Sequence, residues 1–361
     1  MPTKINILLA LSTMDIKPQS IFSSAIRAFC NTFAGIIAVV IGIIILGIIV
    51  GSIFKPQMIS DKTHLLIAAD AEGNRELLPH SAPAVLRLNI HGTIGSKDLN
   101  AKTIHAQLLD SREGMLSDNR VKAILLHISS PGGVAFDAHE IYRNLMDYKE
   151  KYKIPVYAYI DGMCASGGMM IACSADKIFS APTGIIGSVG VLLGPSFNIA
   201  GLMERYGVKQ LTITKGIDKD MLSPYREWEP GEDKSLRAII DYDYNLFVDL
   251  VTQSRPRLSK EKLINEYGAQ VYDPITAEKY GYIDDGNSSY SRSLKALVQE
   301  ANITTNYQVI ELKVVHPVLS GFIEGKSPIL SGKIRHEFDL PIELQPELTN
   351  RPLYLYSPTL Q

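Results

Sequence analysis

The chain has 361 residues, 46% of them hydrophobic, with 36 Lys and Arg against 38 Asp and Glu and a formal net charge of −2. So apolar and so nearly neutral a composition excludes intrinsic disorder, and the lack of a basic excess argues against a nucleic-acid-binding protein. Three cysteines exclude a disulfide-stapled scaffold, and a mean hydropathy of +0.06 argues against a polytopic membrane protein.

An uncharged stretch near the N-terminus predicts a transmembrane helix over residues 33–54, after an N-terminal segment of residues 1–32. No charged residue occurs between Arg27 and Lys55, and a helix of this length spans roughly 33 Å. A buried soluble helix of this length usually keeps a polar face, and a cleaved signal peptide has a shorter apolar region. The flanking basic residues nearly balance, with a slight excess that favours an internal N-terminus.

The rest of the chain divides into a linker (55–82), one domain (83–300) and a C-terminal extension (301–361). In the domain, short apolar runs alternate with helical patterns, which predicts an α/β domain with a largely parallel, buried sheet. We expect strands over 84–94, 121–128, 155–160, 177–181 and 209–214, and helices over 98–109, 136–148, 165–175, 195–206 and 234–254. The extension contains six prolines, which exclude a long helix; we expect extended segments that wrap the domain or a neighbouring subunit.

Two glycine-containing turns follow predicted strands, where such folds place chemistry. In the first, residues 161–170, Ser166 opens an apolar helix, and the glycines after it would let a substrate carbonyl approach the backbone amides. Ser166 could instead be a helix N-cap. In the second, residues 129–134, the backbone could direct N–H donors at a bound group or simply connect a strand to a helix.

A nucleophilic serine needs a base, and the sequence favours lysine over histidine. His127 lies in a strand pattern and His139 in a helix pattern, and neither accompanies a clear aspartate partner motif. The hydrolase motif GxSxG is absent, because Cys164 stands two residues before Ser166. Two lysines of the segment TITKGIDKD follow a predicted strand, although a loop lysine is most often only solvated.

Four motifs, in the order SSPGG, ASGG, TGIIGSVGV and GIDKDMLSPYRE, together resemble the signal peptide peptidase A (protease IV) family of S49 serine peptidases. The resemblance covers residues 84–300 and includes the late segment VYDPITAEKYGYIDD. It implies a ClpP/crotonase-like α/β fold of repeated β-β-α units, here preceded by one N-terminal transmembrane helix. Ser129 departs from the asparagine more common before SPGG in the family, and Met169-Met170 replace aromatic residues, which leaves substrate preference open.

The resemblance also implies roles for individual residues. Lys215 matches no catalytic position of the family. The matches are Ser166 as the nucleophile, Lys219 as the general base, Ser188 as the residue that orients the base, and Gly133, Gly132 and Gly167 as candidates for the oxyanion hole, with Gly133 preferred to Gly132.

The chemistry of a serine–lysine pair sets one further requirement. An amine accepts the serine proton only in its neutral form, which burial away from a counter-ion favours. The mechanism therefore requires the carboxylates of Asp218 and Asp220 to point away from the amine. We predict no cofactor and no metal site, and core packing for Cys164 and Cys173.

From the resemblance we expect a membrane-anchored serine endopeptidase that cleaves signal peptides or other membrane-derived apolar peptides through an acyl-enzyme. We expect a homo-oligomer, an octameric ring in which adjacent subunits supply the serine and the lysine of each site. The expected location is the bacterial inner membrane, single-pass, with the peptidase domain outside the cytoplasm. Alternatives are a crotonase-like acyl-CoA enzyme and a non-catalytic membrane scaffold.

Overall fold

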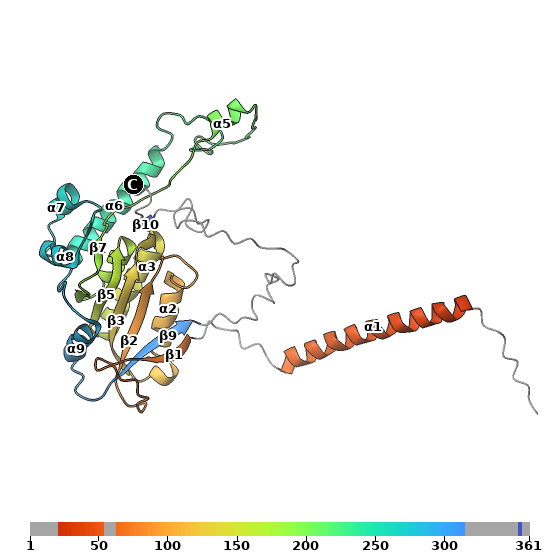
Figure 1. Ribbon diagram of the computed structural model, residues 1–361, viewed down its shortest axis with the longest axis horizontal. Coiled ribbons are helices and arrows are strands. Elements are labelled where there is room, and N and C mark those ends of the chain that lie inside the picture. Colours follow the sequence, from red (N-terminus) through yellow and green to blue (C-terminus); the bar gives the residue numbers. More distant parts are fainter. Residues whose placement is uncertain (1–20, 54–62, 315–352, 356–361) are drawn as a thin grey trace, which may run out of the picture. The chain divides into compact units, whose positions relative to one another are not determined.

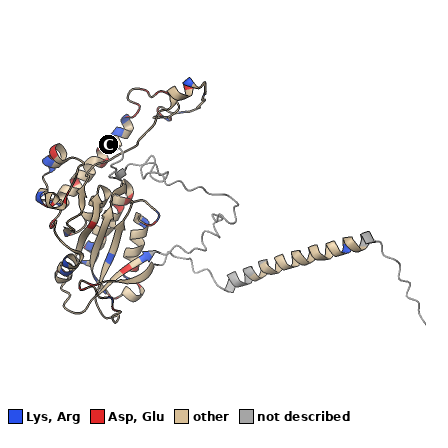
Figure 2. Ribbon diagram, viewed as in Figure 1, with Lys and Arg blue, Asp and Glu red and all other residues tan. Residues whose placement is uncertain are grey.

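The computed structural model describes residues 21–53, 63–314 and 353–355, which belong to two compact units, residues 1–60 and 61–361. The first unit contains one helix, α1 (Ile21–Ile53), whose only charged residue is Arg27 (Figures 1 and 2). Its stretch Ser24–Ile43 is long and apolar enough to cross a membrane. The helix begins well before the predicted start at residue 33, because no proline or glycine interrupts the sequence from residue 21 to that point.

The second unit is built around an eight-stranded sheet with helices on both faces (Figure 1). The strands are β1 (Thr63–Ala68), β2 (Ala84–His91), β3 (Val121–Ser130), β4 (Gly132–Val134), β5 (Val156–Ala165), β6 (Lys177–Ser180), β7 (Ile185–Gly187), β8 (Val271–Tyr272), β9 (Gln308–Val314) and β10 (Leu353–Leu355). The helices are α2 (Ala101–Asp110), α3 (Ala135–Tyr152), α4 (Gly167–Ala172), α5 (Ala200–Arg205), α6 (Lys234–Ser254), α7 (Lys260–Lys262), α8 (Pro274–Tyr280) and α9 (Tyr290–Glu300), with one turn of 3₁₀ helix (Gly114–Leu116) and one of π helix (Leu263–Tyr267).

The sheet has the order β1-β9-β2-β3-β5-β7-β8, with β6 also paired to β5. The central strands β2, β3, β5 and β6 are parallel, as the alternation of strands and helices predicts, and the outer pairs β1–β9 and β7–β8 are antiparallel. Because successive side chains of a strand point to opposite faces, β3 buries Ile124 and Leu126 in the main core and Leu125 in a second cluster. Helices α2, α3, α4 and α6 cover the main core, and α9 covers the second cluster.

Two segments predicted to lie outside the domain add strands to it: β1 and β9 to the eight-stranded sheet, and β10 to a separate two-stranded sheet with β4. Strand β1 comes from the predicted linker and pairs with β9 from the predicted C-terminal extension. Strand β10, further along the extension, pairs with β4, so part of the extension is extended chain against the domain. Residue 54 of the predicted transmembrane helix, residues 55–62 of the linker, and residues 315–352 and 356–361 of the extension lie outside the described residues.

The segment of residues 195–233, here called the arm, departs from the predicted pattern (Figure 1). The strand expected over 209–214 is absent, and the expected helix over 195–206 is reduced to α5. The residues of this segment are largely exposed, with 85% of Leu211 and 89% of Ile213 accessible to solvent. A strand needs a hydrogen-bonded neighbour, and within the described residues none lies beside this segment.

Candidate active site

Ser166 stands between the end of β5 and the start of α4, in a backbone conformation that L-residues rarely adopt. Its φ is 53° and its ψ −115°, and its side chain does not cap the helix. Such conformations cost about 1–3 kcal/mol and persist where the surroundings impose them. Here the Ser166 N–H donates to the Gly187 carbonyl at 2.9 Å, and the Oγ lies 3.5 Å from the Gly190 carbonyl. The N-cap interpretation is therefore wrong, and the conformation is typical of a functional serine.

Helix α4 follows at once and is entirely buried. Its first hydrogen bond runs from the Met170 N–H to the Ser166 carbonyl, so the Gly167 N–H belongs to the first turn, whose amides have no partner within a helix. The helix has only six residues, so the Gly167 N–H itself, rather than a helix dipole, would interact with a bound negative charge. A Cβ on Gly168 would lie 3.0 Å from the Ser130 carbonyl, so the nucleophile turn packs closely against the end of β3.

The glycines of SSPGG form β4, and their hydrogen bonds distinguish them. The Gly132 N–H is bound by the Ser130 Oγ at 3.1 Å, while the Gly132 carbonyl and the Val134 N–H both bond to Ile94. Because peptide groups alternate along a strand, the Gly133 N–H faces the opposite edge of β4. This is the edge where β10 runs antiparallel, with Tyr354 opposite Gly133. The arrangement favours Gly133 over Gly132 as an oxyanion donor.

Ser188 lies next to the Gly187 carbonyl, which accepts the Ser166 N–H. It follows Gly187 of β7, is 6% exposed and has a positive φ of 54°. Its N–H donates to the Gln270 carbonyl at 2.7 Å, which fixes this turn against the residue preceding β8. Ser166 and Ser188 are thus brought together by β7, although no side-chain hydrogen bond joins them among the described residues.

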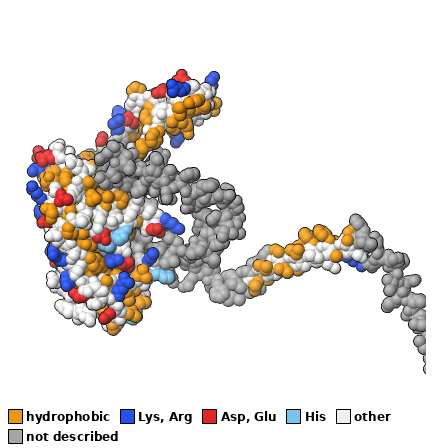
Figure 3. Space-filling model, in the orientation of Figure 1, with side chains coloured by type: hydrophobic (Ala, Val, Ile, Leu, Met, Phe, Trp, Pro, Cys, Tyr) orange, Lys and Arg blue, Asp and Glu red, His pale blue; other side chains and the backbone are white. Residues whose placement is uncertain are grey.

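Lys219 is the predicted site residue that this single chain does not bring to Ser166. It lies exposed in the arm, and within the described part of the chain no hydrogen bond links it to Ser166 or Ser188. The apolar side chains nearby are also exposed, Ile217 at 95%, and Figure 3 shows hydrophobic side chains along this part of the molecule.

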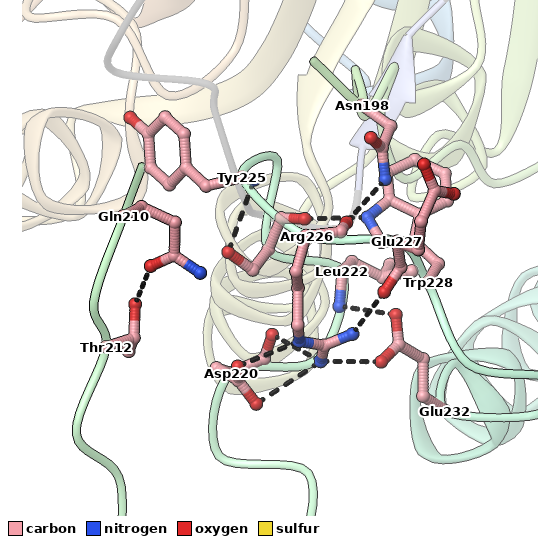
Figure 4. A network of polar contacts seen from close by, with 11 residues as sticks. Asn198, Gln210, Thr212, Asp220, Leu222, Tyr225, Arg226, Glu227, Trp228 and Glu232 are labelled. Atoms are coloured by element: carbon pink, nitrogen blue, oxygen red, sulfur yellow. Dashed lines mark hydrogen bonds and ion pairs between the residues drawn. The ribbon is translucent and has the colours of Figure 1, made fainter. Parts of the chain in front are cut away.

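The Asp220 carboxylate next to Lys219 is held by an arginine (Figure 4). Arg226 donates to Asp220 at 2.8 Å and to Glu232, whose side chain is 4% exposed, at 2.7 Å. These hydrogen bonds lower the pKa values of both carboxyl groups. Glu232 also accepts the Leu222 N–H at 3.0 Å. Arg226 therefore holds the Asp220 carboxylate, which the mechanism requires to point away from the Lys219 amine. The same contacts fix the turn after Lys219.

A cavity of about 1160 Å³ lies beside this turn. It is lined by residues 191–197, which follow the Gly190 carbonyl near Ser166, by residues 220–224 and by the first half of α6. Its size suits a peptide side chain or a short peptide segment.

His127 has an aspartate partner that the sequence does not reveal. Its Nε2 lies 2.7 Å from Asp161 Oδ2, a contact between two strands that no sequence motif marks. The pair does not contact the Ser166 Oγ, whose only hydrogen bond among the described residues is to Gly190. Cys164 and Cys173 are buried and unpaired, and burial raises the pKa of the Cys173 thiol to about 12, which makes that thiol unreactive.

Comparison with known families agrees with this geometry. The family model of peptidase family S49 matches residues 148–304, and that of Clp protease matches residues 86–186. Over residues 148–304 the chain resembles peptidase family S49. Its fold is the ClpP-like α/β fold, and it is a peptidase.

Two curated relatives of the chain illustrate the similarity. The chain is 29% identical over 234 residues to a putative signal peptide peptidase SppA of Enterococcus faecium, covering 63% of this chain and 67% of the relative. It is 32% identical over 207 residues to a putative protease of Methanocaldococcus jannaschii, covering 57% and 64%. The matches thus span about two thirds of each relative. A solved structure of a membrane-bound stomatin-specific protease with a substrate peptide is 18% identical, with a TM-score of 0.38 over 68% of this chain and 98% of that one.

Proposed function

We propose that this peptidase is a membrane-anchored serine endopeptidase in which Ser166 is the nucleophile and Lys219 the general base. The observation that carries the proposal is the positive-φ conformation of Ser166, held by the Gly187 carbonyl directly before the Gly167 amide. A conformation that costs free energy is retained where it serves function. The Gly167 amide, next in the chain, and the Gly133 amide are the proposed oxyanion donors.

The chemistry follows from these positions. The Ser166 Oγ attacks the carbonyl carbon of the peptide bond, and its proton passes to the neutral amine of Lys219. The carbonyl oxygen becomes an oxyanion that the N–H groups of Gly133 and Gly167 stabilise. Lys219 then returns the proton to the leaving nitrogen as the C–N bond breaks. Water, deprotonated by the same amine, hydrolyses the acyl-enzyme and releases Ser166.

The pairing of β10 with β4 supports an extended peptide as the substrate. An extended segment of this chain already lies antiparallel along Gly132–Val134, on the edge that carries the Gly133 N–H. A substrate strand on this edge would gain main-chain hydrogen bonds whatever its sequence, as in other β-strand additions. Apolar side chains of a signal peptide or another membrane-derived peptide would suit the partly apolar cavity at residues 191–197.

A homo-oligomer with composite sites accounts for the position of Lys219. The arm that carries it exposes Leu211, Ile213 and Ile217, and burying each such side chain would contribute roughly 1.5–3 kcal/mol. A second copy could supply the missing strand neighbour of residues 209–214 and receive Lys219 beside its own Ser166. We propose an octameric ring, as the resemblance to the family implies, with Ser188 of the receiving subunit orienting the amine.

Helix α1 supports anchoring in a membrane. Those of its apolar side chains that the structure describes are exposed, and in lipid a helix satisfies all its backbone polar groups internally. We propose a single-pass protein of the bacterial inner membrane with the peptidase domain outside the cytoplasm, where exported signal peptides are released.

The test is hydrolysis of a panel of apolar peptides by the full-length protein in detergent. Ser166→Ala and Lys219→Ala should each abolish cleavage, while Lys215→Ala, on the same arm, should retain it within about threefold. Mixing the two inactive variants and allowing subunits to exchange should restore part of the activity. Cleavage by either single variant would refute the assignment of the pair, and no recovery at any mixing ratio would refute composite sites.

A further inference from the structure

Two histidines and an aspartate converge on the face of the sheet covered by α9. His91 ends β2, His127 lies in β3 and Asp161 in β5, three adjacent strands. One potential ligand atom of each residue lies within 4.8 Å of those of the other two. None of the three takes part in the proposed catalysis.

The register of the parallel strands explains why they meet. Asn89 pairs with His127, and His127 pairs with Tyr159. His91 and Asp161 each lie two residues further along their strands, so all these side chains point to one face. The His127 ring stacks on Tyr159 with centroids 5.9 Å apart and meets the edge of His91 at 4.7 Å. The packing holds the His127 imidazole in one orientation.

His127 retains one buried nitrogen without a partner among the described residues. Its Nε2 contacts Asp161 at 2.7 Å, but its Nδ1 is buried and makes no hydrogen bond. Leaving a buried polar atom unsatisfied costs about 1–3 kcal/mol. The Nε2 lone pair, not that of Nδ1, is directed at Asp161, so an ion bound by both residues would take Nε2 and leave the imidazole proton on Nδ1.

The surroundings of the cluster permit access by an ion. The nearby cation, Arg87, forms an ion pair with Glu311, which offsets its repulsion of an incoming metal ion. The Asp161 side chain is 37% exposed, so the cluster is open to solvent on one side.

We propose that His91, His127 and Asp161 bind a divalent transition-metal ion, for which Zn²⁺ is the best match. Imidazole nitrogens favour zinc, copper and nickel over calcium and magnesium, and two histidines with one carboxylate leave a fourth position for water. Binding needs His127 Nε2 and the Asp161 carboxylate to separate enough for the ion to lie between them, in place of the proton that they share.

Such an ion would connect the strands that carry both halves of the active site. Asp161 lies in β5, the strand that ends directly before Ser166, and His127 lies in β3, two residues before the SSPGG segment that contains Gly133. Metal binding on the sheet face covered by α9 would join these strands to one another and raise the thermal stability of the domain.

The experiment uses the full-length protein in detergent, purified through a tag without histidine and stripped with a chelator. ZnCl₂ is titrated in competition with a chromophoric chelator, and CoCl₂ is titrated by visible absorbance. His91→Ala and Asp161→Asn remove a ligand, and His105→Ala, an exposed histidine outside the cluster, is the matched control. Circular dichroism and melting of the metal-free proteins check that each variant folds.

We expect one Zn²⁺ per chain, tetrahedral cobalt absorption bands and a melting temperature raised by Zn²⁺ in the wild type. Affinity should fall at least about 100-fold in His91→Ala and Asp161→Asn, since outer-shell partners of metal ligands alone are worth 10–100-fold, and it should be unchanged in His105→Ala. No binding by the folded wild type, or equal affinity in wild type and His91→Ala, would overturn the proposal.

Discussion

Replacing Gly133 by alanine tests whether its amide is the oxyanion donor. A Cβ at Gly133 would lie 2.0 Å from the Ile94 carbonyl oxygen and 2.7 Å from the Ile94 carbon and nitrogen. Ordinary contacts at these atoms need more than 3 Å, so β4 must move by about 1 Å or more. A displacement of 1 Å can cost about 100-fold in rate, and loss of one oxyanion donor costs 10²–10³-fold.

The matched control is Gly92→Ala. Gly92 also has a positive φ, 81°, but has open space where a Cβ would be, so both variants carry the backbone strain of about 1–3 kcal/mol and only Gly133→Ala carries the steric contact. We expect kcat to fall about 100-fold in Gly133→Ala, equivalent to about 2.7 kcal/mol of transition-state stabilisation, and less than about threefold in Gly92→Ala. Peptide hydrolysis gives kcat and KM, and a melting curve gives the folded fraction. Equal kcat in the two folded variants would refute the role of Gly133.

Three further predictions concern the arm, strand β10 and helix α1. Arg226→Gln should destabilise the protein at neutral pH, because Arg226 lowers the pKa values of Asp220 and Glu232. The difference in unfolding free energy between variant and wild type, measured with urea, should shrink below about pH 4, where the carboxyls protonate. A difference that does not change with pH would contradict this. Tyr354→Pro removes an N–H from β10 and should lower KM severalfold at constant kcat if β10 competes with substrate for β4; an unchanged KM would count against that competition. A chain that begins at Asp61 should no longer float with lipid vesicles in a density gradient, whereas the full chain should, and flotation of both would argue against α1 as the anchor.

The fold was largely predictable from residue patterns. Alternating apolar runs predict β2, β3, β5 and β6 to within a few residues at most boundaries, because each is buried by a helix whose own pattern is clear. The strand expected over 209–214 is not formed, since its apolar residues have no neighbouring strand in a single chain. The residue patterns do not reveal strands β1 and β9, because β9 pairs with β1 and with β2, both of which lie more than 200 residues before it in the sequence.

The candidate site was predictable only in part. Motifs identify Ser166, Ser188 and the glycines as candidates, and the structure joins Ser166 to Gly187, the residue before Ser188. The geometry adds what sequence does not contain: the Gly132 N–H is already bound by Ser130. The His91–His127–Asp161 cluster has no motif, because its members lie on three strands and meet only through the parallel register.

Covalent labelling tests the central claim most directly. A fluorophosphonate forms a stable bond with an activated serine, and the modified peptide can be located by mass spectrometry. The account predicts one adduct, on Ser166, formed far more slowly in Lys219→Ala but at the wild-type rate in Lys215→Ala. An adduct on a different residue, or labelling of Ser166 at the same rate without Lys219, would contradict it.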